Sequence, residues 1–277
     1  MTEVNYLESL NPLQYESVCS TEGPNLIIAG AGTGKTKVLT TRVAHIIDNN
    51  LAFPSQILCV TFTNKAAREM SERVQKLVSQ NMEKMPWMGT FHSIGAKIIR
   101  NHAEVIGLKQ SFTILDKDDQ LSLIKQIIKA ENLDQSQFSP KLIQSKIDHW
   151  KNKALNPNDI KSESLDNLVD EKSLSIYKIY QARLFEINCL DFGDLLLQCI
   201  NLFKVPDIHK RYSNNFKYIH VDEYQDTNAA QYKWLKLLGS HHQNVCCVGD
   251  DDQSIYSWRG AEVDNMLRFE KEFENAK

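Results

Sequence analysis

The sequence lacks any apolar run long enough to span a bilayer, and this absence argues against a membrane-embedded protein. Its first residues, Met1-Thr2-Glu3-Val4-Asn5, have neither the basic start nor the apolar segment of a secretory signal. We therefore expect a cytoplasmic protein with no membrane partner.

The six cysteines lack the paired C-x-x-C spacing that is typical of zinc sites. Several of them lie inside apolar runs, as do Cys59, Cys246 and Cys247. Such positions predict reduced core residues rather than metal ligands or disulfides.

A basic surplus is also missing, because the net charge is −3. Nucleic-acid-binding proteins usually carry such a surplus, so any site of this kind must be local. Residues 61–110 contain eight Lys or Arg and four Glu. By charge alone, a solvated helix face explains this stretch better than a binding surface does.

What is present is the composition of an ordinary globular protein, with 42% hydrophobic and 24% charged residues. Within it, a short apolar run ends at a glycine-rich stretch, and apolar residues then recur at helical spacing. The stretch reads Ala29-Gly30-Ala31-Gly32-Thr33-Gly34-Lys35-Thr36.

A glycine-rich turn between a strand and a helix is often only a tight connection, but it suits phosphate binding, because backbone N–H groups and the positive end of the helix dipole converge there. Ala29 stands where the usual pattern has glycine, but Gly34-Lys35-Thr36 is intact. A plain strand-to-helix turn rarely carries these three residues. We predict a nucleotide site in which Lys35 reaches the outer phosphates and Thr36 binds Mg²⁺.

Two more strand-to-helix units follow, at residues 57–70 and 87–99. Repeated units of this kind predict parallel strands with helical crossovers, and ligands gather at the carboxyl ends of such strands. We expect one shared edge to carry the residues at these ends: Phe62, Thr63, Asn64, Thr90, Phe91 and His92.

From residue 107 the pattern becomes helical and stays so to about residue 189. The predicted fold class is therefore α/β, with a parallel sheet covered by helices on both faces and interrupted by an all-helical inserted subdomain. The expected domains are residues 1–106 and 190–277 for the sheet and 107–189 for the insertion. Aromatic residues at helical spacing in the insertion are predicted to be core.

Two later strands deliver acids to the same edge. Asp222 and Glu223 follow residues 216–221, and Gln253 follows residues 244–248. An isolated acidic pair is commonly a solvated surface, but this pair directly follows an apolar strand. With the phosphate loop upstream, we predict an ATP-hydrolysing site in which Asp222 holds Mg²⁺, Glu223 takes the proton of the attacking water and Gln253 contacts the terminal phosphate.

Gln14 precedes the first strand, and its amide can both donate to and accept from an adenine edge. Taken alone, a surface glutamine is the simpler interpretation.

These ordered motifs resemble the UvrD/Rep group, which includes PcrA, of superfamily 1 DNA helicases. The resemblance covers nearly the whole chain, and its most specific part is residues 249–261. The matching stretches are Gln14, residues 29–36, Thr61-Phe62-Thr63-Asn64-Lys65-Ala66-Ala67, Gly89-Thr90-Phe91-His92-Ser93, Asp191-Phe192-Gly193-Asp194-Leu195, residues 221–226 and residues 249–260.

The resemblance implies a RecA-like P-loop motor domain that moves 3′ to 5′ on single-stranded DNA with ATP, acting at single-strand/duplex junctions in repair or replication. It makes Gln14 a reader of adenine. It also implies that Tyr256 or Trp258 stacks on a base, since stacking tolerates any sequence; packing of Trp258 in the core is the weaker alternative. The implied DNA contacts are Phe62, Asn64, His92, Tyr256, Trp258 and Arg259.

The sequence departs from the group by ending at Lys277, before a second RecA-like domain. That domain would supply an arginine for the phosphates, a contribution worth roughly three to five decades in rate. We expect slow ATP hydrolysis and no unwinding by this polypeptide alone. Two alternatives stay open: a non-catalytic nucleotide- or DNA-holding half completed by a separate chain, and a small-molecule kinase, for which no acceptor site is visible.

Overall fold

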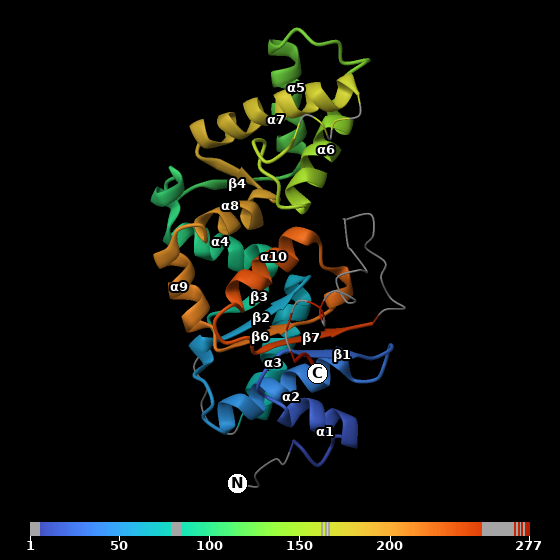
Figure 1. The fold of residues 1–277 in the computed structure, drawn as a ribbon, viewed down its shortest axis with the longest axis vertical. Coiled ribbons are helices and arrows are strands. Elements are labelled where there is room, and N and C mark those ends of the chain that lie inside the picture. Colours follow the sequence, from blue (N-terminus) through green and yellow to red (C-terminus); the bar gives the residue numbers. More distant parts are fainter. Residues whose placement is uncertain are drawn as a thin grey trace. The chain divides into compact units, whose positions relative to one another are not determined.

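A computed structural model describes residues 6–78, 85–161, 163, 165, 167–250, 269, 271, 273 and 275–277 (Figure 1). The chain divides into two compact units. The first contains residues 1–94, 206–227 and 235–277, and the second contains residues 95–205 and 228–234.

The first unit holds most of the strands. Its elements are α1 (Pro12–Cys19), β1 (Asn25–Ile28), α2 (Lys35–Asp48), η1 (Pro54–Gln56), β2 (Ile57–Thr61), α3 (Asn64–Leu77), β3 (Met88–Thr90), α9 (Pro206–Asn215), β6 (Tyr218–Val221), η4 (Tyr224–Asp226) and β7 (Val245–Gly249).

The second unit is mainly helical. Its elements are η2 (Ala103–Ile106), β4 (Thr113–Leu115), α5 (Lys117–Ala130), α6 (Pro140–Asn152), α7 (Leu168–Glu186), β5 (Cys189–Asp191) and α8 (Asp194–Leu202). Two further helices, α4 (Phe91–Asn101) and α10 (Ala229–Leu238), contain residues of both units.

The sheet of the first unit has the strand order β1-β7-β6-β2-β3, and every neighbouring pair is parallel. The predicted α/β class with a parallel sheet flanked by helices is confirmed. The order also places β7 beside β1 and β6 next to β7, although 189 residues separate Ile28 from Tyr218 in the sequence. The carboxyl ends of these three strands therefore meet at one edge.

Apolar residues at helical spacing bury α2 and α3 against this sheet. Leu39 and Val43 of α2 and Met70 and Val74 of α3 are fully buried in one cluster with strand residues such as Cys59. Their spacing of four places each pair on one helix face. This packing fixes the start of α2, and with it the glycine-rich loop before it.

The second unit has its own core between α5, α6 and α7. Tyr177 and Tyr180 are fully buried in it, which confirms the prediction that the aromatic residues of this region are core. The unit is not purely helical, because β4 and β5 pair in parallel. Each has three residues, too few to show a strand periodicity in the sequence.

All six cysteines are free thiols, and five of them are buried; Cys19 is partly exposed. Across the described part of the chain, every helix is too short or too polar to cross a membrane.

Candidate functional site

The glycine-rich loop joins the end of β1 to the first residue of α2. Gly32 and Gly34 have φ angles of 73° and 90°, a backbone region that favours glycine. Gly34 is the N-cap of α2, and no side chain caps this helix end. The first N–H groups of α2 are thus not used by a cap, as an anion site at a helix start requires.

Lys35 lies folded back over this loop. Its Nζ donates to the carbonyl oxygens of Ala29 at 2.9 Å and Gly30 at 3.3 Å, and to Asp250 Oδ2 at 3.0 Å. Asp250 directly follows β7 and is almost fully buried. The sequence offered no signal for this ion pair, because 215 residues separate the partners.

Gln14 touches the same loop from α1. Its Oε1 accepts from the backbone N–H of Asn11 at 3.1 Å, and its Nε2 donates to the carbonyl of Thr33 at 2.9 Å. A Cβ at Gly34 would lie 3.1 Å from that nitrogen. The amide that we expect to read adenine therefore also caps α1 and holds the loop backbone.

Asp222 directly follows β6 and is 5% exposed. Burial and the negative charge of the neighbouring Glu223 raise the pKa of the Asp222 carboxyl to about 6. Three contacts lower this pKa but are outweighed: the backbone N–H of Glu223, the charge of Lys35 and a hydrogen bond with Thr36. The two residues predicted to bind Mg²⁺ thus lie next to each other.

This pair fits Mg²⁺ by its chemistry. A hydroxyl and a carboxylate are the oxygen ligands that the ion prefers. The raised pKa of Asp222 also means that its negative charge is poorly compensated by the protein, and a cation would offset it.

Glu223 has a left-handed backbone, with φ 52° and ψ 47°. This region is unfavourable for a residue with a Cβ and is commonly found at functional sites. Its Oε2 accepts a hydrogen bond from Gln225 Nε2 at 2.7 Å, and Gln225 Oε1 accepts from the backbone N–H of Asp250 at 3.0 Å. Sequence reasoning gave no role to Gln225 or Asp250.

The ends of β2 and β3 carry the next group of predicted residues. Phe62 is half-buried and packs edge-on against the fully buried Phe91, with ring centroids 5.4 Å apart. Asn64 is exposed at the first position of α3, where Thr63 caps the helix through the N–H of Ala66. Phe62 and Asn64 therefore flank a capped turn.

His92 lies near the start of α4, in a turn with reciprocal bonds. The N–H of Ser93 donates to Thr90 Oγ1 at 3.1 Å, and the N–H of Thr90 donates to Ser93 Oγ at 2.9 Å. A Cβ at Gly89 would lie 2.6 Å from the Ser93 hydroxyl oxygen. This contact explains why the Gly-Thr-Phe-His-Ser segment needs glycine first.

Four predicted site residues lie outside the described part of the chain: Gln253, Tyr256, Trp258 and Arg259.

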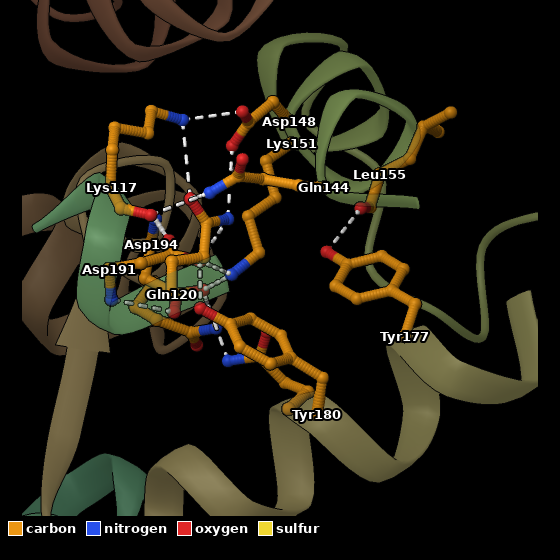
Figure 2. Close-up of polar contacts among 12 residues, drawn as sticks. Lys117, Gln120, Gln144, Asp148, Lys151, Leu155, Tyr177, Tyr180, Asp191 and Asp194 are labelled. Atoms are coloured by element: carbon orange, nitrogen blue, oxygen red, sulfur yellow. Dashed lines mark hydrogen bonds and ion pairs between the residues drawn. The ribbon is translucent and has the colours of Figure 1, made fainter. Parts of the chain in front are cut away.

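The Asp191-Phe192-Gly193-Asp194 segment belongs to the second unit and surrounds a buried ammonium group (Figure 2). Lys151 Nζ lies 2.7 Å from Asp191 and 2.9 Å from Asp194, and all three side chains are almost fully buried. Tyr180 donates to Asp191 Oδ2 at 2.9 Å. The two carboxylates close the turn before α8, while Phe192 is 50% exposed.

Comparison with known proteins identifies the family. Residues 10–274 match the UvrD/REP helicase N-terminal domain family. Similar proteins include "DNA helicase II" of Rickettsia typhi, 51% identical over 100% of this chain and 42% of the relative. "ATP-dependent DNA helicase PcrA" of Staphylococcus aureus strain Mu50 is 49% identical over 98% of this chain and 37% of the relative. The chain spans about two-fifths of the length of these relatives. It belongs to the UvrD/REP helicase N-terminal domain family.

Proposed function

We propose that this chain is the ATP-binding and ATP-hydrolysing motor domain of a UvrD-like 3′-to-5′ DNA helicase. The observation that carries the proposal is the meeting of Lys35, Thr36, Asp222 and Glu223 at the carboxyl ends of β1 and β6. Chain segments nearly 190 residues apart supply a phosphate loop, a metal-ligand pair and a base. Phosphoryl transfer to water needs this combination.

In this proposal the triphosphate takes over the loop contacts that Lys35 now makes with Ala29, Gly30 and Asp250. The remaining cofactor residues are Gln14 at the adenine and residues 29–36 around the phosphates; the N–H of Ala29 itself donates to the Gly249 carbonyl at 3.0 Å. Thr36 and Asp222 would hold Mg²⁺, which when bound neutralises charge on the phosphate oxygens.

Glu223 acts as the base. Its carboxylate takes a proton from water, the water oxygen forms a bond to the γ-phosphorus, and the bond from that phosphorus to the bridging oxygen of ADP breaks. Gln253 is proposed to contact the γ-phosphate. The left-handed backbone of Glu223 supports this role, because such strain persists where the surrounding structure demands it.

Single-stranded DNA and single-strand/duplex junctions are the proposed partners. Phe62, Asn64 and His92 follow β2 and β3, and the half-buried ring of Phe62 offers an aromatic surface for a base. Tyr256, Trp258 and Arg259 complete the proposed contacts.

The remaining parts of the proposal rest on the family. They are action in repair or replication, a cytoplasmic location, and completion of the ATP site by a second RecA-like domain, which a separate chain could supply. The domain division is also part of the proposal: residues 1–106 and 190–277 form the motor, and residues 107–189 form the insertion.

The decisive experiment measures ATP turnover with Mg²⁺, with and without single-stranded DNA, beside nucleotide binding by a fluorescent ATP analogue. We expect Lys35→Ala to weaken binding of the analogue by about 100-fold, and Glu223→Gln to bind it normally while losing turnover. DNA-stimulated turnover well above the Glu223→Gln blank supports the motor function.

Equal binding by the Lys35→Ala variant would refute the placement of the phosphate loop. Normal binding with wild-type turnover no faster than the blank would instead support the alternative, a nucleotide-holding half without catalysis.

A further inference from the structure

Gln225 lies in the short helix η4, between the predicted base and the end of β7. Its side chain is 1% exposed and makes two strong hydrogen bonds in opposite senses. The Nε2 group donates to Glu223 Oε2 at 2.7 Å, and Oε1 accepts from the N–H of Asp250 at 3.0 Å.

The Glu223 carboxylate and the Asp250 N–H together need a side chain that both donates and accepts, as the amide of Gln225 does. A carboxylate partner needs a donor, and a backbone N–H needs an acceptor, so only a side chain with both groups satisfies them. An apolar replacement would leave the buried Asp250 N–H without this acceptor, a loss that typically costs about 1–3 kcal/mol. A glutamate would keep the acceptor but would face Glu223 with a second carboxylate.

The bond to Glu223 limits where its carboxylate can point. The left-handed backbone of Glu223 sets the direction of the side chain, and the 2.7 Å bond holds one of its two oxygens. A base is effective only when its oxygen lies within reach of the water proton. Gln225 holds Oε2 of Glu223 and thereby fixes the direction in which Oε1 points, so it affects the rate of ATP hydrolysis.

The other end of Gln225 leads to the phosphate loop. The N–H of Asp250 donates to Gln225, and the carboxylate of Asp250 accepts from Lys35. A chain of three hydrogen bonds therefore links Lys35 to Glu223. All four residues belong to the first unit.

We propose that Gln225 is a positioning residue of the ATPase site, which holds the Glu223 carboxylate in its working orientation by bracing it against Asp250. This inference rests on the proposed function. Gln225 contacts neither nucleotide nor water in this role and acts only through Glu223.

The test is Gln225→Met in the full chain, with Mg-ATP turnover measured at saturating single-stranded DNA beside wild type and the Glu223→Gln blank. We expect Gln225→Met to lower kcat by about 10- to 100-fold, a part of what a general base contributes, with KM changed by less than about 3-fold.

A second variant covers the case in which Gln225→Met does not fold. Gln225→Glu keeps the shape and the Asp250 bond and should lower kcat at least as much, with normal binding of the fluorescent ATP analogue. Gln120→Met is the matched control, because Gln120 is equally buried and hydrogen-bonded but lies in the second unit. It should alter stability and leave kcat within about 2-fold.

Two results would overturn the inference: a kcat of the Gln225 variants within about 2-fold of wild type, or a loss that appears in KM alone. A failure of the proposed function looks different. In that case wild type itself turns over no faster than Glu223→Gln, and both the function and the positioning role fall.

Discussion

Lys35 Nζ and Asp250 Oδ2 form a 3.0 Å ion pair in which both side chains are nearly buried. The pair joins the start of α2 to the end of β7 and occupies the lysine that we expect to bind phosphate. In the proposed function, nucleotide binding therefore exchanges one anionic partner of Lys35 for another. The contact of Phe62 with Phe91 and the ion pairs of Lys151 with Asp191 and Asp194 lead to further expected outcomes.

Asp250→Asn should tighten nucleotide binding in the absence of Mg²⁺ by about tenfold. The change removes a charge-assisted bond of about 1.5–3 kcal/mol that competes for Lys35, and it also removes repulsion of the phosphates. The backbone N–H that Gln225 uses is retained. Titration with a fluorescent ATP analogue measures the effect, and an unchanged or weaker affinity would show that Asp250 does not compete for the lysine.

Phe62→Ala should weaken single-stranded DNA binding by about 5- to 100-fold, since a stacked base contributes roughly 1–3 kcal/mol. The melting temperature should change little, because Phe62 is only half-buried. Fluorescence anisotropy with a labelled oligonucleotide and a thermal melt separate the two effects.

The matched control is its ring partner, Phe91→Ala. This fully buried residue should lose about 3–5 kcal/mol of stability on truncation. If Phe62→Ala destabilises the chain equally and binds DNA normally, the ring is a core residue and not a DNA contact.

Lys151→Met should destabilise the second unit by roughly 3–5 kcal/mol, because it leaves Asp191 and Asp194 buried together without their cation. Hydrogen exchange over α5 to α8 measures the loss within this unit. Lys153→Met, an exposed lysine just after the same helix, is the control and should cost less than about 0.5 kcal/mol. Equal protection in the two variants would contradict a structural role for the ion cluster.

The pKa values of Asp191 and Asp194 are shifted in opposite directions. Burial and then Asp191 raise the pKa of Asp194 to about 6, from 3.8 when exposed. Burial also opposes ionisation of Asp191, but Lys151 outweighs it and holds the pKa of Asp191 below its usual value. Below about pH 6, Asp191 is thus the main ionic partner of Lys151, whereas at neutral pH both carboxyls are mainly ionised.

A group whose pKa is raised on folding gives its full stabilisation below its unfolded pKa and loses it as pH rises through the folded value. The contribution of Asp194 should therefore fall between about pH 4 and pH 6.5, by about 2 kcal/mol. Asp194→Asn lacks this titration, so its stability relative to wild type should rise across that window. Urea unfolding at several pH values measures the difference, and a constant difference would contradict the assigned pKa.

The local patterns were enough to predict a phosphate loop, repeated strand-to-helix units and acids at strand ends. The strand-to-helix units are confirmed, because glycine and apolar spacing express short-range requirements of backbone and packing. The β4–β5 pair escaped prediction for the same reason, since three-residue strands have no readable period.

By itself, the sequence determined to which family the motifs belong, and it predicts which residues hold phosphate, metal and proton. Only the tertiary structure decided that Lys35 pairs with Asp250, that Gln225 donates to Glu223, and that Lys151 pairs with both Asp191 and Asp194. The physical reason is that these contacts depend on the strand order β1-β7-β6-β2-β3 and on helix packing in the second unit. Long-range pairing of this kind has no local signature in the chain.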